Sequence, residues 1–453
     1  MKQKPSQYEL MTATPVPRLV VKLSIPTVIS MLVTTIYNMV DTAFVGHLGN
    51  SASGAVGVVF GATAILQAVA FMFGQGGGSL MARSAGHKDT DAVNAYASTA
   101  FFLALITAIV ISVLSIAFLP QFVTLLGSTK TIQPFAEDYC LWIMLGAPFI
   151  VCSHVMNNLL RYEGKATLAM FALLTGALLN IALDPLLILV FEMGVAGAGL
   201  ATALSQMVGF SILLYIFRSG KTQCRLSPAF IIHDARKIFD MCFTGFPSLI
   251  RQGLNSGCTI TLNNLIRAGG YGDPAISAMS IVSRIAFFIF ASGLGIGQGF
   301  QPISSFNYGA GKYTRVRKAF FWTLGIATGL IAVICTVCLI FSGDLIALFR
   351  DDPKVIEIGT RALILQCAAM YFQSFGTVTE MMFQSTGKKL GASILSTFRS
   401  GGLFLLFLLI LAPLRGLAGI QEAQPLANFC ATLVAIPFAV TFLRRLPKED
   451  LKE

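Results

Sequence analysis

Long apolar stretches, separated by short polar connections, run through the whole chain. Each is long enough to cross roughly 30 Å of hydrocarbon, which takes ~20 helical residues. Because lipid offers backbone N–H and C=O groups no partner, we expect each stretch to be a helix. Twelve segments are predicted, at residues 19–45, 54–82, 92–118, 136–159, 166–190, 195–217, 237–266, 275–300, 317–341, 358–383, 391–412 and 425–443. The pattern predicts an all-α integral membrane protein with twelve transmembrane helices.

The second feature of the pattern is that it occurs twice. Pro26, Gly74 and Gly164 return as Pro247, Gly297 and Gly387, at separations of 221, 223 and 223 residues. Two halves of six segments each therefore align almost without gaps. We predict an N-terminal lobe at 1–217, a cytoplasmic linker at 218–236 and a C-terminal lobe at 237–453. Internal duplication of a polytopic membrane protein is typical of secondary transporters.

Composition agrees with a membrane protein and excludes a soluble one. Hydrophobic residues make up 55% of the 453 positions and charged residues 12%, whereas soluble domains carry about a quarter charged residues. The chain lacks a G-x-x-x-x-G-K-[ST] phosphate loop, which argues against ATP-driven transport within it. We expect neither an enzyme nor a bound cofactor.

The distribution of the net charge of +11 indicates which side of the membrane each loop faces. Most of the 32 Lys and Arg residues fall in segments that face the cytoplasm if the N-terminus is inside. The outer loops hold five: Lys130, Arg267, Arg350, Lys354 and Arg415. This bias predicts that both termini are cytoplasmic. It also argues against nucleic acid as a partner.

Two carboxylates inside apolar segments break the symmetry of the halves. Asp41 and Asp184 have no acidic counterparts in the second half, where Phe407 aligns with Asp184. Asn180 lies four residues before Asp184 and so shares its helix face. Thr202 on the sixth segment falls at a comparable membrane depth. Intramembrane ionisable groups usually serve function, and these four residues are our candidate cation-coupling site.

Further polar groups surround this set. Tyr37 and Asn38 flank Asp41, and Tyr139 and Asn157 lie on the fourth segment. Carboxylate, amide and hydroxyl oxygens suit a hard cation such as Na⁺. A buried carboxyl group also suits a proton carrier. Both H⁺ and Na⁺ are therefore candidates for the coupling ion.

The repeated proline near the start of each half is the candidate hinge. Pro26 removes a backbone donor about one turn inside the first segment and tends to kink the helix. A static kink and a bend that changes during transport are equally compatible with the sequence. The second half carries basic groups instead of acids: Arg251, Arg284 and Arg399. We interpret Glu380 as part of a structural or gating pair.

Several motifs resemble the multidrug and toxic compound extrusion (MATE) transporters over essentially the whole chain. They are IPTVISMLVTTIYNMVDTAFVGHLG, GQGGGSLMARSAGHKD, GKATLAM with LLNIALDPLLI, and GVAGAGLATALSQ. The resemblance implies a V-shaped pair of six-helix bundles that exports organic cations or drugs in exchange for H⁺ or Na⁺. Asp41, Asn180, Asp184 and Thr202 match the N-lobe cation site of the archaeal-like and DNA-damage-inducible-protein-F-like branch. Tyr37, Tyr139 and Asn157 resemble its hydrogen-bond network.

Other functions remain as alternatives. A flippase for a lipid-linked precursor belongs to the same superfamily, but it should prefer a basic cavity and often has more helices. A seven-helix receptor or a channel fits the two-fold repeat poorly. We expect a monomer in the plasma membrane of a prokaryote, with small organic cations and the lipid bilayer as its partners.

Overall fold

A computed structural model describes residues 6–46 and 48–451 of the chain. At a few helical positions only the backbone is described, and their side chains lie outside the description. These are residues 38, 41–43, 46, 50, 53, 263, 267, 268, 272 and 273.

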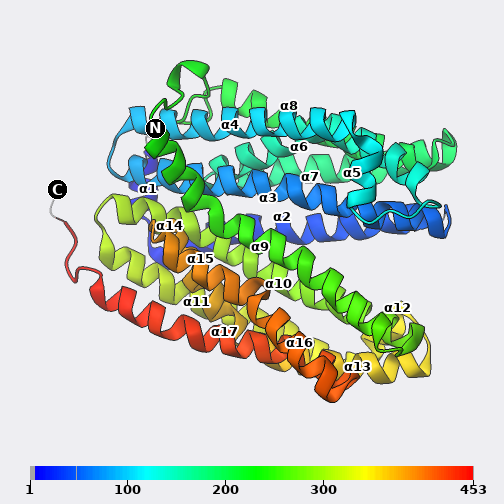
Figure 1. The fold of residues 1–453 in the computed structure, drawn as a ribbon. Helices are drawn as coiled ribbons and strands as arrows, with labels where there is room; N and C mark the ends of the chain where they lie inside the picture. Colours follow the sequence, from blue (N-terminus) through cyan, green and yellow to red (C-terminus); the bar gives the residue numbers. More distant parts are fainter. Residues whose placement is uncertain (1–5, 47, 452–453) are drawn as a thin grey trace. The chain divides into compact units, whose positions relative to one another are not determined.

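The described elements are all helical (Figure 1). The first half contains α1 (Gln7–Ala13), α2 (Val16–Gly46), α3 (Asn50–Gly86), α4 (Thr90–Ala117), α5 (Leu119–Leu125), α6 (Gln133–Tyr162), α7 (Ala166–Pro185), the π-helical turn η1 (Leu186–Val190) and α8 (Gly194–Arg218). A 3₁₀ turn, η2 (Pro228–Phe230), lies in the linker. The second half contains α9 (Ala235–Ala268), α10 (Gly272–Gly309), α11 (Tyr313–Ile340), α12 (Ser342–Phe349), α13 (Pro353–Met370), α14 (Gln373–Ser385), α15 (Lys389–Thr397), the π-helical turn η3 (Phe398–Gly402), α16 (Leu403–Arg415) and α17 (Leu417–Arg445).

All twelve predicted segments fall in helices. Over the described residues, ten helices are long and apolar enough to cross a membrane. The pair α13 and α14, bent by 49° at a short break, forms an eleventh span. The remaining segment is α9, a helix of 34 residues that carries more polar side chains. The fold class is therefore an all-α integral membrane protein, as the hydrophobic pattern predicts.

The chain divides into two compact units that differ from its two sequence halves at two places. One unit contains Ile29–Gln252 and the described N-terminal residues up to Tyr8. The other contains Glu9–Val28 and Gly253–Glu453. We call them the N-terminal and the C-terminal unit. The first part of α2 thus belongs to the C-terminal unit, and the first part of α9 to the N-terminal unit. The lobe boundaries at 217 and 237 stay a prediction about the repeat.

Two hydroxyl groups at corresponding positions of the repeat form hydrogen bonds that bind these exchanged segments to their units. Within the C-terminal unit, Thr27 on α2 donates to the carbonyl oxygen of Gly295 on α10 at 2.6 Å. Within the N-terminal unit, Ser248 on α9 donates to Oε1 of Gln75 on α3 at 3.2 Å. Thr27 and Ser248 correspond in the repeat. Each half therefore contributes the start of its first helix to the unit built mainly from the other half.

Helix α6 is the centre of the N-terminal unit. It packs most extensively against α3 and α8, and Figure 1 shows it among these helices. Two thirds of its most apolar window (67%) is buried, against 22–33% for α3, α4, α7 and α8. Because membrane helices associate through close packing, we interpret the glycine-rich stretch of α3 as packing surface. A Cβ on Gly77 would collide with Ala100 of α4, and one on Gly78 would collide with the ring of Tyr162.

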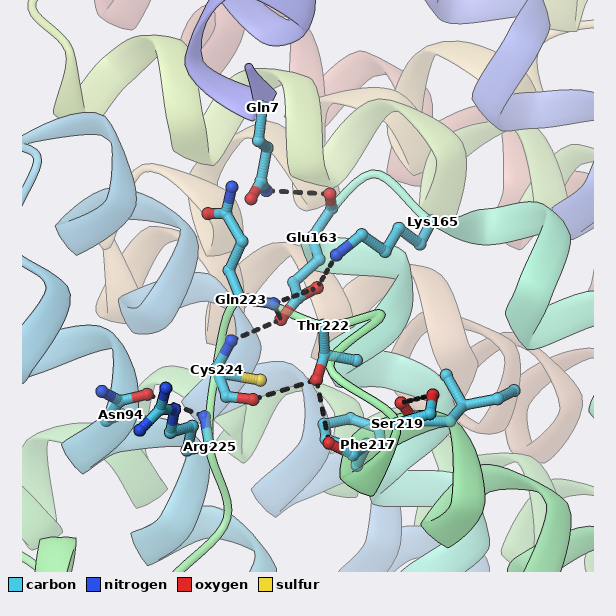
Figure 2. Close-up of polar contacts among 11 residues, drawn as sticks. Gln7, Asn94, Glu163, Lys165, Phe217, Ser219, Thr222, Gln223, Cys224 and Arg225 are labelled. Carbon is cyan, nitrogen blue, oxygen red and sulfur yellow. Dashed lines mark hydrogen bonds and ion pairs between the residues drawn. The ribbon is translucent and has the colours of Figure 1, made fainter. Parts of the chain in front are cut away.

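The connection between the halves is bound to the N-terminal unit (Figure 2). The Glu163 carboxylate, at the turn after α6, accepts the backbone N–H groups of Gln223 and Cys224 at 3.1 and 2.9 Å. Lys165 pairs with the same carboxylate at 2.6 Å. Asn94 on α4 accepts the N–H of Arg225 at 2.7 Å. The charge-assisted hydrogen bonds to Glu163, together with the Asn94 bond, hold the linker in one place.

In the C-terminal unit, α10 packs against α11, α13 and α14, and α17 packs along α16 and α13. The span that begins with α15 is interrupted by η3, where Gly401 has φ of 156°. A Cβ at Gly401 would collide with the sulfur of Cys258 on α9. Glycine at this position therefore permits both the backbone conformation and the close approach of α9.

Candidate functional site

Asn180 links Asp184 and Thr202, the two other residues of the predicted cation-coupling set whose side chains the structure describes. Its Nδ2 lies 3.3 Å from Asp184 Oδ1 on the same helix and 3.4 Å from Thr202 Oγ1 on α8. Asp184 is fully buried and Asn180 is 2% exposed. The structure thus brings together an amide, a carboxyl and a hydroxyl group from α7 and α8, as the sequence predicts.

Local sequence explains where Asp184 stands. Asn180 and Asp184 are one turn apart on α7 and share a face. Pro185 follows directly, and it has no N–H to donate to the carbonyl of Ile181. The chain continues as the wider turn η1, in which the N–H of Phe191 bonds to the carbonyl of Leu186 at 2.9 Å. π-helical turns of this kind often accompany functional sites.

Small residues let α7 and α8 approach each other beside the site. An added Cβ on Gly176 would lie 3.3 Å from the carbonyl oxygen of Ser205, tighter than an ordinary contact. Gly209, one turn after Ser205, faces the carbonyl of Ala172. This close approach keeps Thr202 within reach of Asn180.

A cavity of about 50 Å³ lies beside Asn180 within the N-terminal unit. This volume is enough for at least one water molecule or a small cation. Four helices, α2, α6, α7 and α8, supply its walls. The lining residues are Thr34, Tyr37, Ser153, His154, Asn157, Ala172, Leu173, Gly176, Ala177, Asn180, Thr202, Ser205, Gln206, Gly209 and Leu213. Four predicted residues, Tyr37, Asn157, Asn180 and Thr202, therefore border one cavity.

Two polar oxygens at the cavity accept no hydrogen bond from the described part of the chain. They are Asn180 Oδ1 and Ser205 Oγ. A buried amide oxygen without a donor costs free energy, so such a group usually has a water or ligand partner. Asn180 Oδ1 therefore offers a ligand position toward the cavity.

Asn157 has a bridging position on α6. Its Nδ2 donates to the carbonyl oxygen of Ala169 on α7 at 2.7 Å, and its Oδ1 accepts from Arg161 Nε at 2.8 Å. The Nδ2 bond joins α6 to α7, whereas the Oδ1 bond lies within α6 and fixes the orientation of the amide. We interpret Asn157 as a residue that positions the cavity wall.

Tyr139 lies elsewhere on α6, 18 residues before Asn157 and so about 27 Å from it along the helix. It is 5% exposed and packs against Gly199 of α8, three residues before Thr202. Tyr139 therefore packs against the turn of α8 that precedes Thr202 and is not among the cavity residues.

Two predicted residues cannot be placed by their side chains. Asp41 and Asn38 belong to α2 by their backbone, and their side chains lie outside the described residues. Tyr37, which precedes them, lines the cavity. Pro26 is buried in α2, two residues before the point where this helix passes from one unit to the other.

Sequence reasoning missed His154. This residue lines the cavity, its Nδ1 lies 2.8 Å from the carbonyl oxygen of Ile150, and its ring meets Phe71 edge-on. The sequence feature that could have identified it is its spacing of three and four residues from Asn157 and Asn158, which places it on the same helix face. A histidine inside a membrane segment is a functional candidate by the same argument as a carboxylate.

The arrangement suits the binding of one small cation. Asp184, Asn180 and Thr202 supply carboxylate, amide and hydroxyl oxygens, which are the ligand types that Na⁺ takes. Burying a charged carboxylate is costly unless a proton or a metal ion compensates the charge. The described residues contain no group of three or more His, Cys, Asp or Glu side chains placed to hold a metal ion. A transition-metal centre is therefore not indicated among them.

Comparison with known proteins gives a consistent picture. A sequence model of the MatE family matches residues 26–186 and 247–410, which include both halves of the repeat. The multidrug export protein MepA of Staphylococcus haemolyticus is 26% identical over 432 residues, 93% of each chain. A crystal structure of MATE in the straight conformation shares 26% identity, with a TM-score of 0.92 over 99% of this chain and 100% of that one. MATE in the bent conformation gives a TM-score of 0.89 at 26% identity, over 98% and 99% of the two chains.

Proposed function

Because the chain belongs to the MatE family of multidrug efflux transporters, we propose that it is a secondary active antiporter. It exports organic cations or drugs from the cell in exchange for H⁺ or Na⁺. It is a multi-span membrane protein of a transporter family, and its bacterial relatives indicate the plasma membrane. We further propose that both termini are cytoplasmic and that it acts as a monomer.

The observation that carries the proposal is the buried cluster of Asp184, Asn180 and Thr202 beside a cavity. Asn180 and Thr202 line the cavity, so a cation that enters it can meet the open Asn180 Oδ1 and the Thr202 hydroxyl. Asp184 does not line the cavity itself, and its carboxylate adjoins it through Asn180. Asp41 is the second proposed acid of the cation-coupling set. Tyr37, Asn38, Tyr139 and Asn157 form the proposed supporting network, in which Asn157 acts by holding α6 and α7 together.

Exchange requires that ion and drug each bind two states of the protein with different affinity. A similar protein is known in a straight and in a bent conformation, which supports two states here. We propose Pro26 as the position on α2 where the bend changes. Neutralising Asp184 or Asp41 removes the cost of burying a charge, and this biases the equilibrium toward the more closely packed state.

Reconstituted vesicles test the function and identify the ion. Vesicles that contain the purified protein are loaded with a fluorescent cationic dye, and either a pH gradient alone or a Na⁺ gradient alone is applied. We expect the dye to move in the direction opposite to the flow of the coupling ion. The gradient of the other ion should cause no dye movement. Equal dye movement in protein-free vesicles, or no response to either gradient, contradicts the antiporter.

A further inference from the structure

A large pocket in the C-terminal unit lies outside the site described above. It has a volume of about 600 Å³, within the range of ligand-binding pockets. The ends of α10, α14 and α17 and the start of α11 surround it. Lys388, which precedes α15, and Arg445, the last residue of α17, both line it and are exposed. The described residues that line the pocket include no acidic side chain. The pocket therefore carries a positive charge of two.

Aromatic rings form its apolar walls. Phe383 packs against Phe438 and Phe442, with ring centroids 5.8 and 5.2 Å apart. Tyr308 and Tyr313 stand edge-to-face at 5.7 Å. Tyrosines and basic residues together are typical of the membrane–water interface, because their apolar bodies enter lipid and their polar ends reach water. The charge bias of the loops predicts that this interface is the cytoplasmic one.

Hydrogen bonds within the C-terminal unit hold the frame of the pocket. Arg317 Nη2 donates to the carbonyl oxygens of Leu443 and Leu446 at 3.0 and 3.2 Å, which fixes the end of α17. The Asp450 carboxylate accepts the N–H and the hydroxyl of Thr314 at 2.8 and 2.6 Å. The Asp450 carboxylate oxygens are therefore engaged at the start of α11, and Asp450 is not among the residues that line the pocket.

The apolar part of the pocket extends along α17 away from its basic end. Pro437, Phe438 and Phe442 line the pocket one to two turns before Arg445. Their spacing places them on the same side of the helix as Arg445. A ligand with an anionic head and a hydrocarbon chain matches both features.

We propose that this pocket binds the head group of an anionic phospholipid of the inner leaflet. The phosphate lies between Lys388 and Arg445, the glycerol part rests on the aromatic walls, and an acyl chain leaves along Pro437 and Phe438. Basic pockets between membrane helices recognise anionic lipid head groups in this way. The binding site is separate from cation coupling, so it is independent of the proposed antiport.

Displacement of a fluorescent phosphatidylglycerol from the purified full-length protein in neutral detergent tests the proposal. Unlabelled phosphatidylglycerol should compete, whereas phosphatidylcholine and soluble glycerol phosphate at equal concentration should not. Removing one cation, by Lys388→Gln or Arg445→Gln, should weaken binding about fivefold, and removing both should weaken it roughly 30-fold. The control Arg444→Gln with Lys448→Gln loses the same net charge from exposed positions outside the pocket and should bind like wild type.

A second variant keeps both basic side chains, Lys388 and Arg445, and fills the volume of the pocket. Thr441→Trp places a large ring in the pocket from the exposed side of α17 and should abolish binding while thermal unfolding stays unchanged. Three results overturn the proposal. They are equal loss of affinity in the control pair, equal competition by phosphatidylcholine, and full displacement by glycerol phosphate, which indicates a soluble anion as the ligand.

Discussion

Arg399 and Glu380 form a buried ion pair in the C-terminal unit, with Arg399 Nε and Nη2 at 2.6 and 2.5 Å from Glu380 Oε2. The 223-residue repeat aligns these positions with Gly176 and Asn157, which both line the cavity of the N-terminal unit. The guanidinium group of Arg399 thus occupies the position at which the first half has Gly176 beside the cavity. Phe407 takes the place of Asp184. We therefore expect coupling cations to bind only in the N-terminal unit.

The first prediction concerns Asp184. Asp184→Asn keeps the size and the hydrogen bonding of the side chain but removes its charge and its titratable proton. Dye export from cells at wild-type expression should fall to the level of cells without the transporter, and Asp41→Asn should act alike. Glu192→Gln is the matched control, because Glu192 is exposed just beyond η1. Wild-type resistance to a cationic dye in both Asn variants would show that the site assignment is wrong.

The second prediction concerns competition between ion and drug. If neutralisation of the N-terminal carboxylates favours drug release, linkage requires the drug to weaken ion binding by the same factor. The drug dissociation constant should rise when pH is lowered, for proton coupling, or when Na⁺ is added, for sodium coupling. Asp184→Asn should flatten this response in equilibrium binding. A wild-type affinity that is independent of both pH and Na⁺ contradicts competition.

The third prediction concerns the ion pair in the C-terminal unit. Glu380→Gln leaves the buried guanidinium without its counter-charge, so it should destabilise the protein by about 3–5 kcal/mol. The double variant Glu380→Leu with Arg399→Met should recover most of this loss, since no charge stays buried. Thermal unfolding in detergent measures both effects.

The exposed pair of Arg415 and Glu422 is the control for this prediction. Glu422→Gln should cost less than about 1 kcal/mol, because solvent screens the charges there. The stoichiometry of coupling ions per drug should be the same in the double variant as in wild type. A change in that stoichiometry would mean that the C-terminal unit takes part in ion binding.

The fourth prediction concerns the linker. Burial raises the pKa of the Cys224 thiol well above its usual range, and the adjacent Glu163 carboxylate adds to the shift. The thiol is therefore protonated at neutral pH, and its maleimide labelling should still rise with pH above 9. For Gln223→Cys at an exposed position, in a Cys224→Ser background, the labelling rate should be half-maximal at pH about 8.5 and level off above it. Mass spectrometry of the labelled peptides gives both profiles.

Glu163→Gln extends this test. The amide replaces a carboxylate that accepts two backbone N–H groups and pairs with Lys165. Since hydrogen bonds to charged groups contribute about 1.5–3 kcal/mol, the linker should loosen and Cys224 should label faster at neutral pH. Unchanged labelling would show that Glu163 does not hold the linker.

The fifth prediction concerns Pro26. Pro26→Ala restores a backbone donor on α2 and should favour the unkinked helix. Transport should be lost while the dependence of drug affinity on pH or Na⁺ stays as in wild type. This combination assigns Pro26 to the motion and not to ion binding. Normal transport in Pro26→Ala would instead make the proline a static kink.

The sequence by itself determined the helices, the repeat and part of the site. Helix length follows from the thickness of the hydrocarbon layer, so apolar stretches alone predicted all twelve helical segments. The one-turn spacing of Asn180 and Asp184 is a local property of α7, and it predicted their contact without tertiary information. Both results depend only on residues that are near each other in the chain.

Only the tertiary structure decided which helices meet. It assigned the first parts of α2 and α9 to opposite units, added His154 to the cavity, and paired Glu380 with Arg399. These contacts join residues on different helices. In lipid, association depends on close surface fit and a few hydrogen bonds, because an apolar side chain is as stable against lipid as against a neighbouring helix. Hydrophobic periodicity therefore does not reveal the partner of each face, and packing of small residues such as Gly77 and Gly176 decides it.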